Sequence, residues 1–295
     1  MRKKEKLSLI VSTYRSEQYL PQFFVNILGL KEFFDLEVII IMNDPTLGET
    51  KCIQRMVLNY IYETNLLKKI NIIKIDREKL YFSWNRGLKI ATNEFVLITN
   101  IDDYVYPKAI SNIITEMKKN KNVIIGSGPI DSLSKNKFSL SQQQDQTIQD
   151  EYMCCIGGAF VFKKNNLTRN MFFNTKYSIV GDYEFQLQAM KRNGKIFFNK
   201  KSIGIYRNFQ TGLSTSKGVT LTIEQQLVYL ENGIYEKLIV NTRLLLICAN
   251  IVKIMPIIFE INNVEDDFSI KKIFYGFYLL LKTITYHFLT RIFKS

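Results

Sequence analysis

Short runs of β-branched and other apolar residues alternate, in the first half of the chain, with longer stretches whose apolar residues recur every three or four positions. Runs of the first kind are typical of buried strands, and stretches of the second kind are typical of amphipathic helices. Strand and helix therefore alternate, which predicts an α/β fold with a mostly parallel, doubly wound sheet covered by helices. The predicted strands are 7–12, 37–42, 70–75, 95–99 and 123–126, and the predicted helices are 17–30, 49–64, 81–92 and 108–119.

The second half of the chain is less regular. Residues 132–150 are rich in Ser and Gln and have no apolar period, so they are expected to form a mobile surface loop. Further elements are expected at 157–162 (strand), 182–193 (helix), 196–198 (strand) and 202–206 (strand). The pattern predicts one compact domain over residues 1–217 and a helical C-terminal extension over residues 218–295.

Composition narrows the chemistry. The 295 residues contain a single histidine, His287, which excludes Ser-His-Asp triads, Cys-His dyads and most zinc sites. Neither a G-x-G-x-x-G motif nor a P-loop occurs, and the four cysteines have no C-x-x-C spacing. Acid-base chemistry must therefore use carboxylates, and the thiols are expected to be reduced, as in a cytoplasmic protein.

The net charge of +13 predicts attraction to nucleic acid, anionic lipid or phosphorylated small molecules. Lysine outnumbers arginine and no nucleic-acid-binding motif occurs, which disfavours nucleic acid as a partner. Residues 268–295 carry five basic side chains, no acidic ones, and apolar residues at helical spacing. Such a tail either lies in a membrane interface or packs within the protein or an oligomer, and the sequence leaves both open. No transmembrane helix is expected.

Polar residues follow the first, second and fourth predicted strands, where ligands bind in open parallel sheets. Two of them, Asp102 and Asp103, are adjacent carboxylates, which repel each other unless a cation or water screens them. Mg²⁺ or Mn²⁺ commonly takes one or two carboxylates together with substrate phosphate oxygens. The turn is therefore a candidate metal-diphosphate site, and a solvated acidic turn is the alternative. The residues that follow these strands are Ser12, Thr13, Tyr14 and Arg15, then Asn43, Asp44, Pro45 and Thr46, then Asn100, Asp102 and Asp103.

These motifs have a characteristic order. A strand ending in STY and another ending in ND are followed by KLYFSWNRGLKIATNEFVLITNIDD, then GGAFVF, then GDYEFQLQAMKRNG. In that order and spacing the chain resembles the family 2 glycosyltransferases of the GT-A fold, over about residues 6–216. The resemblance implies a nucleotide-diphosphate sugar donor and a divalent metal, Mn²⁺ or Mg²⁺.

The resemblance also implies roles for residues of the donor site. Ser12, Thr13 and Tyr14 would line the nucleotide pocket, and Asn43 or Asp44 would read the base, although an ordinary turn is the plainer interpretation of Asn-Asp-Pro. Asn85 and Gly87 match an R-N-x-G element that supports the nucleotide, with Trp84 in place of the usual Arg. Asn100 replaces the first Asp of the D-x-D motif, so Asp102 with Asp103 would carry the cation.

The remaining motifs concern the acceptor and the base. Gly157 and Gly158 match a glycine pair near the acceptor, and Asp182 matches the general base that takes a proton from the acceptor hydroxyl. Asp182 also suits a helix start, where it would cap free N–H groups. Gly181 stands where relatives often have Glu, and Arg207 could close on the donor diphosphate or lie at the surface.

Together these features predict an inverting enzyme that adds one sugar to a glycan or lipid-linked acceptor, because the Q-x-x-R-W signature of processive synthases is missing. A nucleotidyltransferase on a related fold, or a non-catalytic basic module that binds membrane or nucleic acid, is the alternative. We expect a cytoplasmic protein, with peripheral contact at the inner membrane face or a homo-oligomer depending on the tail.

Overall fold

The computed structural model describes residues 4–64, 69–134, 137–139, 159–165, 168–207 and 218–232. The chain divides into two units, Met1–Ser216 and Lys217–Ser295. The second unit is described over one helix, α7 (Gly218–Asn232). The glycines Gly157 and Gly158, most of the Ser- and Gln-rich segment and the basic tail lie outside the described residues.

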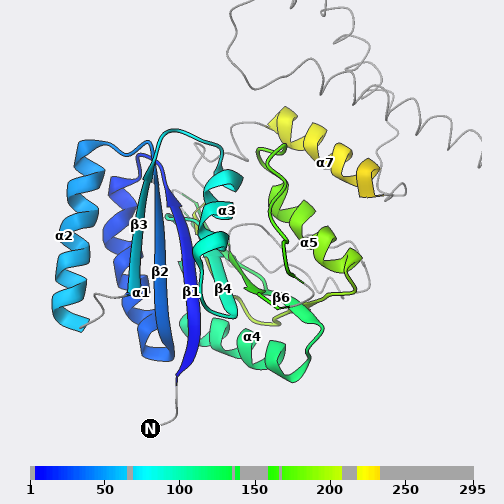
Figure 1. The fold of residues 1–295 in the computed structure, drawn as a ribbon, viewed down its shortest axis with the longest axis horizontal. Helices are drawn as coiled ribbons and strands as arrows, with labels where there is room; N and C mark the ends of the chain where they lie inside the picture. Colours follow the sequence, from blue (N-terminus) through cyan, green and yellow to red (C-terminus); the bar gives the residue numbers. More distant parts are fainter. Residues whose placement is uncertain are drawn as a thin grey trace, which may run out of the picture. The chain divides into compact units, whose positions relative to one another are not determined.

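Strands and helices alternate through the first unit, which Figure 1 shows in sequence colours. Its strands are β1 (Glu5–Thr13), β2 (Phe34–Asn43), β3 (Ile70–Ile75), β4 (Phe95–Thr99), β5 (Tyr104–Val105), β6 (Val123–Ser127), β7 (Asp131–Ser134), β8 (Lys137–Ser139), β9 (Ala159–Lys163), β10 (Lys195–Phe198) and β11 (Gly204–Arg207). Its helices are the short η1 (Glu17–Tyr19), then α1 (Leu20–Phe33), α2 (Leu47–Thr64), α3 (Leu80–Ile90), α4 (Pro107–Lys119) and α5 (Gly181–Lys191).

Seven strands form the main sheet in the order β10-β6-β9-β4-β1-β2-β3. β1 pairs in parallel with β2 and β4, and β2 pairs in parallel with β3. β9 is the exception, since it runs antiparallel to both β4 and β6. A second sheet joins β5, β11, β7 and β8. The predicted α/β fold with a mainly parallel, helix-covered sheet is confirmed.

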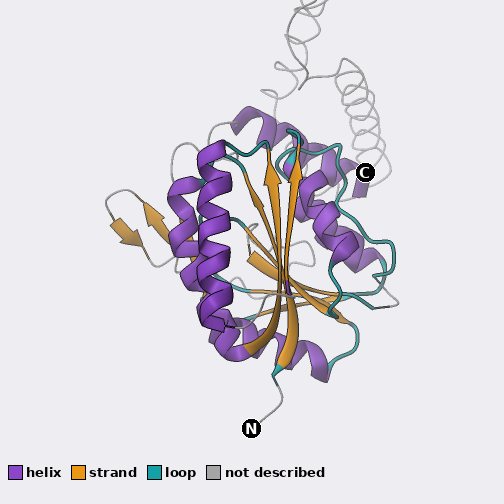
Figure 2. Cartoon of the chain, turned by 60° about the vertical axis from the view of Figure 1, so that its left-hand side comes forward, coloured by secondary structure: helices purple, strands orange, loops and turns teal. Residues whose placement is uncertain are grey.

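Two helical layers bury the main sheet, as Figure 2 shows. On one face, Leu7, Leu9 and Val11 of β1 share a core with α1, α2 and α4. On the other face, α3 approaches β1 closely at Gly87, where an added Cβ would lie 2.5 Å from Cγ2 of Ile10. Central strands that are buried on both faces need continuous apolar runs, which explains why these strands can be recognised in the sequence.

The expected loop over 132–150 is partly wrong. β7 and β8 form a hairpin there, with Leu133 opposite Phe138, and β7 also pairs in parallel with β11. β7 is held by backbone hydrogen bonds to β11, which is distant in sequence, and β8 by hydrogen bonds to β7, so neither strand needs apolar alternation of its own. The short β5, which pairs with β11, also has no sequence signal.

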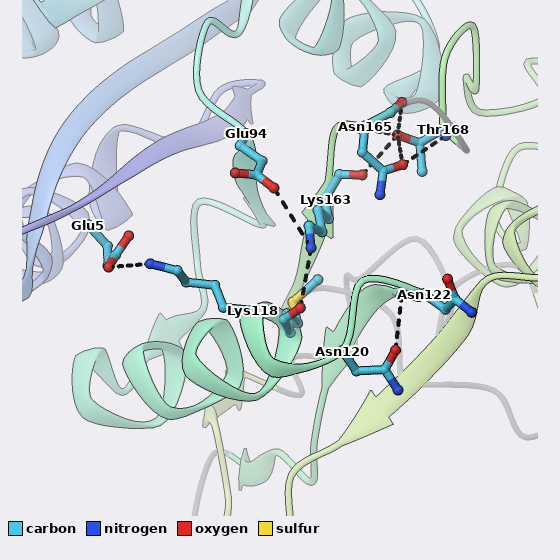
Figure 3. Close-up of polar contacts among 9 residues, drawn as sticks. Glu5, Glu94, Lys118, Asn120, Asn122, Lys163, Asn165 and Thr168 are labelled. Atoms are coloured by element: carbon cyan, nitrogen blue, oxygen red, sulfur yellow. Dashed lines mark hydrogen bonds and ion pairs between the residues drawn. The ribbon is translucent and has the colours of Figure 1, made fainter.

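Two adjacent lysines fix β9 to both helical layers. Lys163, only 6% exposed, has its ammonium 3.3 Å from the carbonyl of Met117 in α4 and 3.7 Å from Glu94 (Figure 3). Lys164 points to the other face and donates to the carbonyls of Leu88 and Ala91 at the end of α3. A cation suits the carboxyl end of a helix because the helix dipole is negative there. The two lysines therefore link β9 to α4 on one face of the sheet and to α3 on the other.

Among the described helices, none combines the length and the apolar character that crossing a membrane requires.

Candidate functional site

The candidate residues converge because of the parallel pairing. β1, β2, β3 and β4 all run in the same direction, so the residues that follow them share one edge of the sheet. That edge carries the segments after Thr13, Asn43, Ile75 and Thr99. Ligands of open parallel sheets bind at such an edge.

Tyr14 is the most exposed aromatic group among these segments, at 41%. The guanidinium carbons of Arg15 and Arg77 each lie 5.3 Å from the centre of its ring. Arg15 is also 3.6 Å from Asp44, and both residues have a left-handed backbone with φ 49°. Left-handed non-glycine residues are uncommon and concentrate at functional sites. The arrangement presents a flat ring, two cations and a carboxylate to solvent.

Arg77 was not expected from the sequence. It follows β3 in a charged segment with no recognisable motif, and only the pairing of β3 with β2 brings it beside the loop after β1. The signal that could have found it is positional, because it occupies the same strand-end position that directed attention to Tyr14 and Asp44.

The loop after β1 is anchored by the buried carboxylate of Glu49. Glu49 of α2 is fully buried, and its Oε1 accepts hydrogen bonds from the backbone N–H and the hydroxyl of Ser16, at 3.1 and 2.8 Å. Ser12 is half-buried, whereas Thr13 is buried with a hydroxyl that has no partner in the described part of the chain. Tyr14 and Arg15 therefore project from a loop anchored at Ser16.

Asn43 and Asp44 have different surroundings. Asn43 is buried, and its amide both donates to the carbonyl of Glu78 and accepts from the backbone N–H of Glu78, at 2.8 and 2.9 Å. It also donates to Ser83 Oγ at 3.3 Å. Asn43 thus ties β2 to the segment before α3, while Asp44 keeps an exposed carboxylate. Of these two side chains, that of Asp44 is the one open to solvent.

The R-N-x-G element lies on α3 and faces the protein interior. Asn85 donates from Nδ2 to the carbonyl of Phe173 at 2.9 Å and accepts from the backbone N–H of Phe173 at 2.8 Å. Gly87 allows the close approach to β1 described above. Trp84 is buried 5.2 Å from the Phe173 ring, and its Nε1 has no partner within the described ranges. In this structure the residues of this element contact the segment around Phe173 and do not form an exposed surface.

The acidic turn after β4 contains two carboxyl groups in different positions. Asp103 is 4% exposed, and its two oxygens accept from Asn100 Nδ2 at 2.9 Å and from the backbone N–H of Arg207 at 3.3 Å. Burial, and then the negative charge of Asp102, raise the pKa of Asp103 to about 7. Burial also raises the pKa of Asp102, which is half-buried, against the opposing effects of a backbone hydrogen bond and of the charge of Arg207.

This geometry separates the roles of the two carboxyl groups. Asp103 is held inside the turn by the side chain of Asn100 and the backbone of Arg207, whereas Asp102 is half-buried beside it and has a backbone N–H and the charge of Arg207 near its carboxylate. Within those residues no three His, Cys, Asp or Glu side chains gather as a metal cluster. A cation at Asp102 would therefore need oxygen ligands from elsewhere, such as a diphosphate.

Arg207 reaches the same turn from the second sheet. It is the last residue of β11, and its guanidinium carbon lies 5.8 Å from the centre of the Tyr19 ring. Its positive charge lowers the pKa of both Asp102 and Asp103. Asn100, Asp102, Asp103 and Arg207 are therefore brought together as one charged group.

Asp182 is the second residue of α5, after Gly181. The N-cap position belongs to Val180, and Asp182 Oδ1 instead accepts from the backbone N–H of Tyr183 at 2.9 Å. The hydroxyl of Tyr81, which donates to the carbonyl of Ile179 at 2.5 Å, lies 3.3 Å from the same oxygen. The Asp182 carboxylate thus accepts a hydrogen bond from one backbone N–H of the first helical turn, as the capping alternative predicts. The N-cap position itself, however, belongs to Val180.

Comparison with known proteins gives one family. The model of glycosyl transferase family 2 matches residues 8–185. A mannosyltransferase, PcManGT from Pyrobaculum calidifontis in complex with GDP-Man and Mn²⁺, has a similar structure, with a TM-score of 0.58 and 15% identity over 78% of this chain and 64% of that one.

Two structures of TarS 1–349 from S. aureus are also similar. The complex with UDP-GlcNAc has a TM-score of 0.59 and 16% identity over 80% of this chain and 68% of that one. The complex with UDP has a TM-score of 0.58 and 16% identity over 77% and 65%. The chain thus spans about two thirds of the length of these proteins, and at such identity the likeness establishes the GT-A fold. Comparison with curated proteins finds no match. Because the family model covers more than half of the sequence, the chain belongs to glycosyl transferase family 2.

Proposed function

We propose that this protein is a metal-dependent, inverting glycosyltransferase that moves one sugar from a nucleotide-diphosphate sugar to a glycan or lipid-linked acceptor. The observation that carries the proposal is the acidic turn after β4. There Asp103 is held by Asn100 and Arg207, and Asp102 stands at the sheet edge where the donor loops converge.

The donor nucleotide is proposed to bind at the ends of β1 and β2. The exposed ring of Tyr14 would stack on the base, Asp44 would accept a hydrogen bond from it, and Arg15 and Arg77 would neutralise phosphate charge. Ser12 and Thr13, which precede Tyr14 at the end of β1, are proposed to belong to the same nucleotide pocket. The similar structures support a donor of this class, since they contain GDP-Man, UDP and UDP-GlcNAc.

The acidic turn fits a divalent cation, Mn²⁺ or Mg²⁺, by its chemistry. Two neighbouring carboxyl groups with pKa values raised by burial favour a positive charge beside them. Asp102 would bind the cation directly, and Asp103, with Asn100, would hold the turn in shape as well as contribute negative charge. When bound, such a cation supplies charge neutralisation for the departing diphosphate. Arg207 would add a second positive charge on the same side.

Asp182 is proposed as the general base. The acceptor hydroxyl oxygen attacks C1 of the sugar as its proton passes to a carboxylate oxygen of Asp182. The bond between C1 and the phosphate oxygen breaks on the opposite side, and its electron pair leaves with the nucleoside diphosphate. The configuration at C1 inverts because the attack and the departure occur on opposite faces. Gly157 and Gly158 are proposed to border the acceptor.

The proposed cellular location rests on the composition of the C-terminal tail. We propose that residues 268–295, which are basic and free of acidic residues, bring a cytoplasmic enzyme to the inner face of the membrane. Deletion after Asp267 is expected to abolish salt-sensitive binding to anionic liposomes and to leave the remaining protein folded. An aggregated deletion variant would instead favour packing of the tail within the protein or an oligomer.

The central experiment is a thermal-shift screen with UDP-, GDP- and dTDP-sugars, each with and without Mn²⁺, and with a CMP-sugar as a monophosphate comparison. At least one diphosphate donor is expected to raise the melting temperature, and to do so more strongly with Mn²⁺. For the stabilising donor, Asp182→Asn is expected to abolish transfer, whereas Glu184→Gln on the same helix retains it. Absence of any nucleotide-induced shift, or full transfer by Asp182→Asn, would overturn the proposal.

A further inference from the structure

Tyr81, the second residue of α3, contacts the start of α5 through both its hydroxyl and its ring. The hydroxyl donates to the carbonyl of Ile179 at 2.5 Å and lies 3.3 Å from Asp182 Oδ1. Tyr81 is only 2% exposed, so it cannot reach a substrate and can act only through its neighbours. Burial, together with the charge of Asp182, raises the pKa of Tyr81 well above its usual value, so the hydroxyl keeps its proton.

The ring of Tyr81 fills the space beside Gly181. A Cβ added at Gly181 would lie 2.6 Å from Cε2 and 2.7 Å from Cδ2 of that ring, closer than any side chain tolerates. The two positions are therefore complementary, with a large ring on α3 and no side chain on α5. This also gives a physical reason for glycine at position 181, where the family resemblance suggests Glu.

Tyr81 is itself held on several sides. Its ring stacks on Phe173 at 5.5 Å with an interplanar angle of 20°, and it meets Trp84 edge-on at 5.5 Å. Phe173 in turn stacks on Phe185 of α5 at 4.2 Å. Because Asn85 fixes the backbone of Phe173, the ring of Tyr81 has little freedom to move. A group so constrained can hold another in place.

We propose that Tyr81 is a positioning residue that sets the first turn of α5, and with it the orientation of the Asp182 carboxylate, through its hydroxyl and its fit against Gly181. The inference rests on the proposed role of Asp182 as the base. Positioning of this kind matters because a base must lie within hydrogen-bond reach of the acceptor hydroxyl.

The test compares Tyr81→Phe with Tyr106→Phe. Tyr106 offers a matched control, since its hydroxyl also donates to a carboxylate, Asp131 Oδ2 at 3.1 Å, on the second sheet. Hydrogen exchange needs no ligand, and we expect amides 179–184 to exchange about 5-fold faster in Tyr81→Phe and unchanged in Tyr106→Phe. With the donor found by thermal shift, we expect kcat to fall about 10-fold in Tyr81→Phe, with less than about a 2-fold change in donor KM.

A second pair of variants tests the ring. Gly181→Ala is expected to lower kcat in the wild-type background and to cost less in a Tyr81→Leu background, where the ring is gone. Unchanged exchange and kcat in Tyr81→Phe, or equal effects of Gly181→Ala in both backgrounds, would overturn the positioning role. The proposed function fails separately, if Asp182→Asn still transfers sugar. Asp182→Asn losing transfer while Tyr81→Phe behaves as wild type would remove this inference alone.

Discussion

Replacement of Asn85 by Ala tests whether the R-N-x-G element serves the fold or the nucleotide. The change removes an amide that donates to the carbonyl of Phe173 and accepts from its backbone N–H. Phe173 is buried, and its backbone groups would lose these partners with little access to water. The variant therefore opens a polar gap between α3 and the segment before α5.

The magnitude follows from the two lost hydrogen bonds. A buried donor or acceptor left without a partner costs about 1–3 kcal/mol, so a loss of about 3 kcal/mol in the free energy of unfolding is expected for the pair. In a unit of this size 1 kcal/mol corresponds to about 2–4 °C, which predicts a melting temperature lower by about 6–12 °C. Asn85→Asp should do similar damage, because a carboxylate cannot donate to the Phe173 carbonyl.

The assay is urea and thermal unfolding, with Asn112→Ala as the control. Asn112 is exposed on α4, so its replacement should leave the melting temperature nearly unchanged. The nucleotide-induced shift in melting temperature should persist in Asn85→Ala. If instead the variant melts like the wild type but no longer responds to nucleotide, Asn85 contacts the donor and the reasoning from its hydrogen bonds is refuted.

Three further predictions concern the acidic turn, the α3–β1 contact and the donor loop. Because the folded pKa of Asp103 is about 7, against 3.8 for an ordinary Asp, the contribution of this group to the stability of the metal-free protein should be largest below pH 4, and up to about 4 kcal/mol of it should be lost as the pH rises to 7. Titration of stability by urea unfolding would show this slope, and Asp103→Asn should flatten it. Equal stability at pH 5 and pH 7 would contradict the assigned environment. Gly87→Ala places a Cβ against Ile10 and should destabilise the protein by about 1–3 kcal/mol, and the same change should cost less when it is made in an Ile10→Ala background. Tyr14→Ala should weaken nucleotide binding, measured by calorimetry, about 10-fold while the melting temperature of the free protein stays the same, because base stacking is worth about 1–3 kcal/mol. Loss of folding in Tyr14→Ala would show that the ring is structural.

The main sheet could be predicted from the sequence because its central strands are buried on both faces. In β2, the run from Val38 to Met42 is buried throughout, so it has no polar position to break the pattern. β7 and β8 could not be found in this way, since β7 pairs with β11, about 70 residues away in the chain, and β8 is joined to the sheet through β7. The local pattern of apolar residues predicts strands that are buried in the core. It does not predict strands that are held by backbone hydrogen bonds to a distant part of the chain.

The candidate site shows the same division. Asp102 and Asp182 lie in local motifs and were identified from them, and their chemical roles remain proposals. Arg77 and Glu49 lie in no motif, and Tyr81 lies in the stretch KLYFSWNRG without any sign there of its partners, because each of the three contacts a loop or helix from another part of the chain. For Asn85 the motif was visible, but its partner, Phe173, was not.

The contact between Asn85 and Phe173 joins residues 88 positions apart, which affects how the protein is made. At about 5–20 residues per second, the ribosome needs about 4–18 s to synthesise that interval. During this time α3 can already pack on β1 and β2, while Tyr81 and Trp84 await the aromatic rings that cover them. In the newly made N-terminal half, Tyr81 and Trp84 therefore lack the ring of Phe173 for several seconds, and the aromatic cluster can close only after that segment has been synthesised.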